Sequence, residues 1–439
     1  MDRETLGIIA FPILFGLLAF RVPIGLAMLV VGSAGTAMIA GWLPIFSQVK
    51  TSAWHLFSNY SLSVIPLFLL MGNLASRAGM SEALFKFASA CLGHRKGGVA
   101  MAAVGACAGF GAICGSSLAT AATMGKVALP ELRRLGYSGS LSTGALAAGG
   151  TLGILIPPSV ILIIYSILTE QNIAKMFLAA LVPGILAAVG YIVTIAIFVR
   201  LVPGSGRAQP RVSMAGRLVF FHNIWHILLI FTFMLSGIYL GWFTPTEGAA
   251  VGAAGTGIVA ILQKDFGFEA LLDVIQSTAI TSGMIFLVLL GAEFFNSFIA
   301  LTQLPVLLAS FVTEGDFTPL VVVAAILVLY MLLGCLMDSM AMILLTIPVF
   351  FPLIMTLDFG MTAEETAIWF GLLTLIVVEV GLITPPVGLN VFIINKLAGD
   401  VKIADTFRGV VPFLISDIVR VVLLFSFPSI SLFLIRLFP

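Results

Sequence analysis

Two short polar segments interrupt long apolar stretches of this sequence, and both have the chemistry to bind a small cation. The first reads Gly-Ser-Ser at residues 115–117 and the second reads Met-Asp-Ser at residues 337–339. Hydroxyl, carboxylate and freed carbonyl oxygens are the ligands that hard cations prefer. A helix that restarts after such a break also presents N–H groups to an anion. The residues therefore predict a cation and an anion bound side by side.

Intramembrane carboxylates sharpen this prediction. Asp338, Glu379 and Glu293 lie within apolar segments, and no Lys or Arg occurs between residues 265 and 395. A buried carboxylate without a basic partner is costly and is usually functional. For Asp338 we expect a bound sodium ion, with a protonated carboxylate as the alternative. Glu379 and Glu293 either take part in the site or pair with a basic residue from the first half of the chain.

The composition shows what must surround these residues. The chain has 439 residues, of which 60% are hydrophobic and 9% are charged, whereas a soluble domain carries about 25% charged residues. This excludes a soluble enzyme, a disordered protein and a basic nucleic-acid binder. The sequence indicates an all-α polytopic membrane protein, with room for about a dozen crossings of roughly 20 residues each. We expect no removable signal peptide, and we expect the four cysteines to be packing residues.

Four breaks interrupt the apolar segments. Two are the polar segments described above, and two are Pro-Pro pairs at 157–158 and 385–386. Irregular backbone at membrane depth survives only where it is buried in protein or lines a polar cavity. We therefore predict two re-entrant hairpins, over 99–129 and 319–355, and two helices that are broken at the Pro-Pro pairs.

The breaks occur twice in the same order. The sequence Gly-Ile-Leu-Ile-Pro-Pro at 153–158 corresponds to Gly-Leu-Ile-Thr-Pro-Pro at 381–386, and each follows one polar tip. This shared order indicates an internal repeat. The alignment places Glu379 opposite Thr151, so the second site should be the more anionic of the two.

Charge shows how the two halves, 1–217 and 218–439, are oriented. Residues 1–220 hold 15 Lys plus Arg and 5 Asp plus Glu, whereas residues 221–439 hold 6 and 15. Because Lys and Arg favour the cytoplasmic side, the first hairpin should enter from the cytoplasm and the second from the opposite face. The prediction is an inverted-topology repeat with about ten full spans plus two re-entrant hairpins, and with both termini periplasmic.

The remaining elements predict a mechanism. The amphipathic stretches Pro44–Tyr60 and Asp265–Ser277 precede the third span of each half and are too polar or too short to cross. We expect them to brace a fixed scaffold, while a transport domain, approximately 99–168 and 319–395, moves as a rigid body. Such motion of one bundle against another is the usual route to alternating access and gives an elevator-type transporter.

The sequence resembles a known family at motifs spread over nearly the whole chain. Besides the polar tips and the Pro-Pro pairs, these are Arg-Val-Pro-Ile-Gly at 21–25 and Phe-Thr-Pro-Thr-Glu at 243–247. The family is the large membrane (M) subunit of tripartite ATP-independent periplasmic (TRAP) transporters, the DctM family. The resemblance implies a sodium-coupled importer of organic acids, such as C4-dicarboxylates or sialic acid, in the bacterial inner membrane. It also implies two partners: a small four-helix membrane (Q) subunit, expected as a separate protein, and a periplasmic substrate-binding (P) protein.

The resemblance also implies a set of ligands. One sodium site would use the first tip and the first broken helix, with Ser116, Ser117, Gly150, Gly153 and Pro157. The other would use their counterparts in the second half, Asp338, Ser339, Gly381, Thr384 and Pro385. The organic anion would lie between the two sites, near Ser116, Ser159, Ser339 and Asn390. Sodium is then the coupling ion, and we expect no resident cofactor.

Other functions fit parts of this pattern. A stand-alone sodium/dicarboxylate symporter would have the same architecture, and neighbouring genes for a binding protein and a small subunit would separate the two. A membrane-embedded enzyme would need a concentrated acid/base or nucleophile cluster, whereas the polar residues at the breaks are mostly Gly and Ser. We therefore expect no enzyme. The sequence leaves open which organic acid is carried, the sodium stoichiometry and whether protons also couple.

Overall fold

The computed structural model describes residues 2–263 and 266–437, and these residues fold into helices joined by loops. The first half contains α1 (Arg3–Ala19), α2 (Ile24–Ala40), α3 (Leu43–Ser58), η1 (Tyr60–Ser63), α4 (Val64–Arg77), α5 (Met80–Leu92), α6 (Gly98–Cys114), α7 (Ser117–Arg134), α8 (Gly139–Leu155), α9 (Val160–Leu168) and α10 (Ile173–Leu201). The connection to the second half contains α11 (Met214–His222). The second half contains α12 (Trp225–Tyr239), α13 (Pro245–Ile261), α14 (Phe268–Thr302), α15 (Leu304–Glu314), α16 (Pro319–Gly334), α17 (Ser339–Met355), α18 (Ala363–Gly381), α19 (Leu389–Ala398), α20 (Ile403–Ser426) and α21 (Pro428–Leu437).

Local sequence signals set the ends of these helices. In α13 and α18 a threonine caps the helix and a glutamate three residues later bonds back to it, which satisfies two backbone N–H groups at each start. The threonines are Thr244 and Thr362. The reversal between α6 and α7 falls at Gly115, whose φ of +65° lies in the left-handed region that favours glycine.

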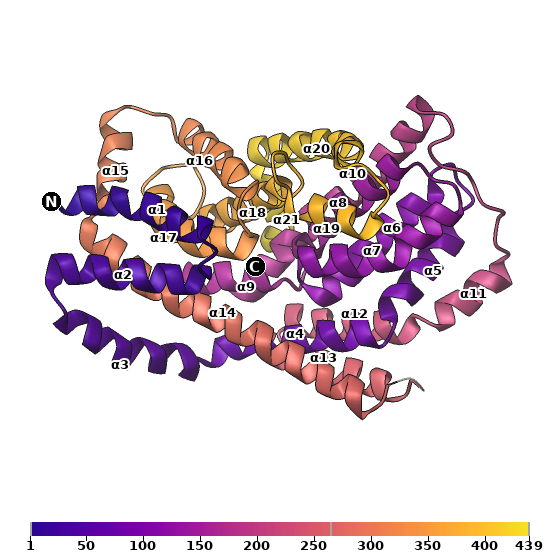
Figure 1. Ribbon diagram of the computed structural model, residues 1–439, viewed down its shortest axis with the longest axis horizontal. Helices are drawn as coiled ribbons and strands as arrows, with labels where there is room; N and C mark the ends of the chain where they lie inside the picture. Colours follow the sequence, from indigo (N-terminus) through magenta and orange to yellow (C-terminus); the bar gives the residue numbers. More distant parts are fainter. Residues whose placement is uncertain (1, 264–265, 438–439) are drawn as a thin grey trace.

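The two halves have the same order of helices and interlock. Helices α1 to α10 correspond in order to α12 to α20, with α3, η1 and α4 together matching α14. Helix α2 packs along α14, and α4 packs along α13. Each of these pairs therefore takes one helix from each half, as Figure 1 shows for the indigo α2 beside the salmon α14.

Each half contributes one hairpin and one broken helix. Helices α6 and α7 form the first hairpin, and α16 and α17 form the second, on opposite sides of the molecule in Figure 1. Helices α8 and α9 are separated at Pro157-Pro158, and α18 and α19 at Pro385-Pro386, each with a cis peptide bond between its prolines. All four predicted breaks are confirmed as interruptions between helices.

One amphipathic arm differs from its prediction. In the first half, α3 is a separate helix that bends by 58° from the next segment, and the side chain of Asn59 caps the short turn between them. In the second half, the predicted arm Asp265–Ser277 is the first part of the unbroken helix α14, with Asp265 itself outside the described residues. No proline lies within α14, so nothing in that sequence forces a second break.

The helices suit a membrane environment. Three of them, α10, α14 and α20, are long and apolar enough to cross unbroken, and up to six spans result if three bent helix pairs are each counted as one. Several shorter apolar helices are also present. A total of ten crossings would require some of these short helices to cross as well, so that number stays a prediction. Along α10, exposed apolar side chains recur every four residues, at Ile185, Val189, Val193 and Ile197. A helix with such an outward stripe faces lipid, and the chain is a polytopic membrane protein.

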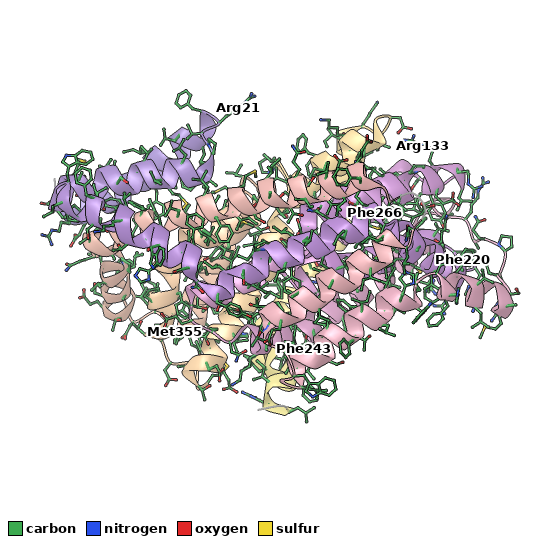
Figure 2. All side chains as sticks on the ribbon, turned by 90° about the horizontal axis from the view of Figure 1, so that it is seen from below. Arg21, Arg133, Phe220, Phe243, Phe266 and Met355 are labelled. Carbon is green, nitrogen blue, oxygen red and sulfur yellow. The ribbon has the colours of Figure 1, made fainter. Side chains whose placement is uncertain are left out.

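Four ion pairs join segments that are distant in the sequence. They are Arg77–Asp273, Arg133–Asp400, Lys175–Glu364 and Arg436–Glu365. In the orientation expected from the charge distribution, the first two pairs would lie at the cytoplasmic face and the other two at the periplasmic face. Figure 2 shows Arg21 and Arg133 toward its upper edge, and Phe243 and Met355 toward its lower edge.

Candidate functional site

The tips of the two hairpins meet at one cavity. It measures about 80 Å³ and is lined from the first tip by Gly115, Ser116 and Ser117, and from the second by Asp338 and Ser339. The opposite wall comes from outside the hairpins, with Leu69 of α4 and Thr281 and Ile285 of α14. The structure therefore brings together the two polar segments that the sequence singled out, and it closes their cavity with largely apolar side chains from the interlocked helices.

Three helices begin beside this cavity, and each has a polar side chain at its cap. Ser116 accepts from the backbone N–H of Ala119 at the start of α7, at 3.4 Å, and Asp338 accepts from that of Met340 at the start of α17, at 3.1 Å. Ser159 caps α9 in the same way. Helix N-termini carry a partial positive charge. Those of α7 and α17 meet at the cavity, which suits an anion.

Glu379 connects the two tips. Its side chain is 1% exposed. One carboxylate oxygen accepts a hydrogen bond from Ser339 at 2.7 Å, and the other accepts from Ser117. No Lys, Arg or His forms an ion pair with Glu379 or Glu293 among the described residues. Of the two interpretations of Glu379, the structure therefore supports a place in the site rather than an ion pair with the first half.

Close backbone contacts join each hairpin to its broken helix. A Cβ atom on Gly153 would lie 2.7 Å from the carbonyl oxygen of Ser116, and one on Gly381 would lie 2.6 Å from the Cα atom of Gly334. The Cβ of Gly111 would likewise meet Gly153 at 2.5 Å. Only glycine fits at such distances, so the small residues of both predicted sodium sites hold the hairpins against the breaks.

The first predicted sodium site is compact. Pro157 is buried, and Gly150 packs against Ala121 of α7, where an added Cβ would lie 2.7 Å from the Cβ of Ala121. Thr120, one turn after the tip, points its hydroxyl at Gly153. That hydroxyl is buried without a hydrogen-bond partner in the described part of the chain. Sequence reasoning missed Thr120, although it follows Ser117 by three residues and so shares its helix face.

The second predicted sodium site is more open. Gly381 is buried, but Pro385 is exposed and Thr384 is only partly buried. The hydroxyl of Thr384 donates to the carbonyl of Val380 at 2.7 Å, so it is not aimed at the tip. A backbone bond from Gly388 to the carbonyl of Cys335, at 3.4 Å, joins this break to the second tip.

The predicted anion ligands do not all reach the cavity. Ser116 and Ser339 line it, whereas Ser159 and Asn390 are fully buried and are not among its lining residues. Asn390 donates to the carbonyl of Ala147 at 3.4 Å, and its amide oxygen has no partner among the described residues. Asn390 therefore joins the second broken helix to the first.

The structure contains a second buried polar network, which the sequence analysis did not predict. Thr151, the repeat counterpart of Glu379, shares a hydrogen bond with Tyr191 at 3.0 Å, and Tyr191 donates to Asp417 at 2.7 Å. Asp417 pairs with Arg420 at 2.8 Å, and both are at most 5% exposed. Because Asp417 and Arg420 are three residues apart on α20, their spacing could have indicated a pair.

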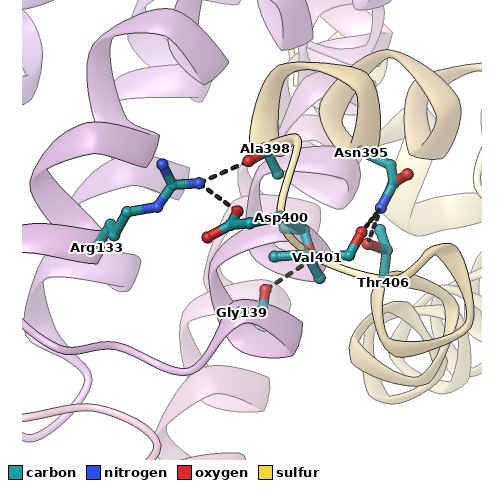
Figure 3. A network of polar contacts seen from close by, with 8 residues as sticks. Arg133, Gly139, Asn395, Ala398, Asp400, Val401 and Thr406 are labelled. Atoms are coloured by element: carbon teal, nitrogen blue, oxygen red, sulfur yellow. Dashed lines mark hydrogen bonds and ion pairs between the residues drawn. The ribbon is translucent and has the colours of Figure 1, made fainter.

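The first hairpin is also tied to the second half at its base. Figure 3 shows Arg133, at the end of α7, donating to the carbonyl of Ala398 at 2.6 Å and pairing with Asp400. Beside it, Asn395 donates to the carbonyl of Val401 at 2.7 Å. These bonds fasten α7 to the loop between α19 and α20, so the first hairpin and the second broken helix form one packed unit.

The available ligands fit sodium rather than a transition metal. Within residues 2–263 and 266–437, no group of three or more His, Cys, Asp or Glu side chains is placed to hold a metal ion. The atoms at the tips are hydroxyl, carboxylate and carbonyl oxygens. Among the described residues that line the cavity there is no Cys or His, the usual ligands of zinc, copper or iron, and the one sulfur atom belongs to Met340. The partnerless oxygens of Thr120 and Asn390 are further candidate ligands.

Opposed hairpins that meet broken helices at a polar cavity define a class, the membrane transporters. Over residues 11–430 the chain matches the family described as tripartite ATP-independent periplasmic transporter, DctM component, and it belongs to that family. It is 35% identical over 405 residues to the C4-dicarboxylate TRAP transporter large permease protein DctM of Pseudomonas aeruginosa, covering 91% of this chain and 92% of that one. It is 32% identical over 382 residues to the sialic acid TRAP transporter permease protein SiaT of Haemophilus influenzae, covering 85% of this chain and 60% of that one.

The fold is also found in a solved structure. The crystal structure of the Alcanivorax borkumensis YdaH transporter aligns with a TM-score of 0.65 at 14% sequence identity, covering 92% of this chain and 96% of that one. The likeness concerns the fold. The DctM family match independently confirms the resemblance drawn from the tips and the Pro-Pro pairs.

Proposed function

We propose that this permease subunit imports a small organic acid together with sodium ions. The observation that carries the proposal is the cavity at which both hairpin tips meet. It combines carboxylate and hydroxyl oxygens with two helix N-termini. Oxygen ligands suit sodium, and helix N-termini suit a carboxylate. C4-dicarboxylates and sialic acid, named for the two relatives above, are both anions of this kind.

Different residues would bind the two sodium ions and the organic anion. At the first site, the carbonyl of Ser116, the hydroxyl of Ser117 and the small residues of α8 would hold one sodium ion. At the second, Asp338 and Ser339 would hold another beside Gly381. The organic anion would lie between them, oriented by the N-termini of α7 and α17. The bound cations would offset its charge, which lowers the cost of holding the anion at membrane depth.

The packing supports an elevator-type movement. Leu69 and Thr281 come from α4 and α14, the interlocked helices, and they face the tips across the cavity. Helices α10 and α20 pack on α8, with α20 along much of its length. We therefore extend the predicted transport domain, 99–168 and 319–395, to include α10 and α20. The scaffold would then consist mainly of α1 to α4 and α12 to α14.

The proposed transport involves two partner proteins. A periplasmic P protein would deliver the acid, and a small four-helix Q subunit would lie against the scaffold, where it does not obstruct the moving unit. A related chain named isethionate TRAP transporter permease protein DctMQ, from Oleidesulfovibrio alaskensis, is 28% identical to this chain. We place the complex in the bacterial inner membrane with both termini periplasmic. The two ion pairs on each predicted face support this orientation.

Reconstituted transport tests the proposal. The subunit would be inserted into proteoliposomes with its Q subunit, and uptake of labelled succinate or sialic acid would be followed with the P protein outside. We expect uptake only under an inward sodium gradient. Equal uptake on a proton gradient without sodium would contradict sodium coupling. Uptake that needs neither the P protein nor the Q subunit would instead indicate a stand-alone symporter.

A further inference from the structure

The buried carboxylate of Glu379 lies where the two halves of the molecule meet, and its role is not explained by either sodium site alone. Its two oxygens accept one hydrogen bond from each hairpin, from Ser117 at the first residue of α7 and from Ser339 at the first residue of α17. We call these three residues the tip bridge. Both serines are 1% exposed, so water does not compete for these bonds.

The carboxyl group of Glu379 is bonded to the hairpins rather than to a basic side chain. No ion pair to it forms among the described residues. Since both serines begin a helix, the positive ends of α7 and α17 lie beside the carboxylate together with the two hydroxyl donors. Moving either tip away would leave a buried carboxyl oxygen without its hydrogen-bond donor, which is costly. The carboxylate therefore favours the arrangement in which both tips are in place.

The repeat does not duplicate this feature. The counterpart of Glu379 in the first half is Thr151, whose hydroxyl bonds to Tyr191 and not to a tip. A single side chain at the centre thus serves both hairpins. Glu379 also lies in the last turn of α18, two residues before that helix ends at Gly381, so the second broken helix is held by the same bonds.

We propose that Glu379 is a positioning residue that couples the two tips, so that the two cation sites form together or not at all. This inference rests on the proposed sodium-coupled function. Binding at one tip would fix its serine, and through Glu379 the opposite serine would be held ready for the second ion. Sodium binding should therefore be cooperative, and the two tip serines should act as a unit although they lie 222 positions apart in the chain, at 117 and 339.

A double-mutant cycle tests the coupling. The purified protein would be titrated with sodium at constant ionic strength, with thermal stabilisation and the Hill coefficient as readouts. Ser117→Ala, Ser339→Ala and the double variant would be compared with the unmodified chain. We expect the loss of sodium affinity in the double variant to differ from the product of the single losses by about fivefold or more, a typical coupling between linked sites.

The same cycle in a Glu379→Leu background isolates the bridge. Leucine has a similar size and removes both acceptors together with the charge, so the chain should still fold. In this background the loss of sodium affinity in the double serine variant should equal the product of the two single losses to within about twofold, as for independent sites. The Hill coefficient should fall toward one. Glu379→Gln can still bond to both serines and should restore part of the coupling. Thr374→Val, which changes a buried hydroxyl without a described partner on the same helix, should leave the coupling unchanged.

The outcomes separate the two proposals. An unmodified chain that sodium does not stabilise would contradict the proposed function itself. A chain that sodium stabilises, but whose coupling persists in the Glu379→Leu background, would contradict the bridging role alone. The bridging role would also be overturned if, with Glu379 in place, the double serine variant lost sodium affinity only by the product of the two single losses.

Discussion

The two broken helices share a backbone design but differ in charge and access. At the first break both prolines are buried, and the residue two positions before Gly153 is Thr151. At the second break both prolines are exposed, and the corresponding position is Glu379. The acidic residue Asp338 lies on the second tip as well, where it lines the cavity. An inverted repeat therefore supplies two similar frameworks, while single side chains decide how each one binds and from where it is reached.

The surroundings of the two broken helices also stabilise buried acidic side chains differently. Behind the first break, Tyr191 connects Thr151 to an ion pair between Asp417 and Arg420. At the second, Glu379 has no basic partner among the described residues and accepts hydrogen bonds from two serines that each begin a helix. Breaking the first network should therefore affect stability, whereas changes around the second should affect mainly the binding of ions. The predictions below separate these effects in order of expected size.

The largest effect should come from Arg420→Leu. This change leaves the carboxylate of Asp417 buried without its partner, which typically costs about 3–5 kcal/mol. Thermal or denaturant unfolding of the purified protein should show a loss of that size. The double variant Asp417→Leu with Arg420→Leu removes both charges and should recover much of it. A single variant as stable as the unmodified chain would show that the pair does not support the first break.

Asp338→Asn should act on binding rather than on folding. The amide can still cap α17, but it loses the negative charge at the second site. We expect the sodium concentration for half-maximal uptake to rise by about 30-fold, because bonds to charged groups are worth about 1.5–3 kcal/mol. The control is Asp358→Asn, at an exposed carboxylate that accepts from Gly360. An unchanged sodium dependence in Asp338→Asn would remove this residue from the site.

The paired glycines test whether the two frameworks are equally tight. Gly153→Ala would place a Cβ 2.5 Å from the hydroxyl of Thr120, and Gly381→Ala would place one 2.6 Å from Gly334. Each should lower the free energy of unfolding by about 1.5 kcal/mol, within the usual range for overpacking. Gly105→Ala, on α6 with nothing within 4 Å, is the control and should not destabilise the protein. If only one of the two site variants is destabilised, the frameworks are not equivalent.

The smallest effect should come from the ion pairs at the ends of the helices. Lys175→Ala removes the 2.9 Å pair with Glu364, in which both side chains are partly exposed. Such pairs contribute about 0–1 kcal/mol, so the unfolding midpoint should hardly move. Arg77→Ala, at the other predicted face, should behave in the same way. A loss comparable to that of Arg420→Leu would show that these pairs, and not the buried network, hold the two halves together.

The sequence was sufficient to predict the breaks because they violate the rules for helices in lipid. A Pro-Pro pair, or a Gly-Ser-Ser segment within an apolar stretch, has no other stable place there. The second hairpin, predicted over 319–355, consists of α16 and α17 with the same outer limits. The unbroken α14 was harder to foresee, since amphipathicity alone does not show whether an arm bends away from the following span.

The partners of buried polar groups were not predictable in the same way. Ser117 and Glu379 are far apart in the chain, and their contact depends on how the two halves interlock. Thr151 and Asp417 likewise meet only through Tyr191. The residue types indicated that Glu379 was either a site residue or one half of an ion pair, and only the folded structure shows that its side chain bonds to a serine of each tip.

The inverted repeat, on which both sites depend, is tested most directly by labelling from each side of the membrane. The four cysteines would be replaced by alanine, and Arg95→Cys and Glu364→Cys would be introduced separately. These positions lie near the bases of the first and second hairpins. With an impermeant thiol reagent, Arg95→Cys should react only from the cytoplasmic side and Glu364→Cys only from the periplasmic side. Reaction of both from the same side would contradict the inverted topology and the paired sites built on it.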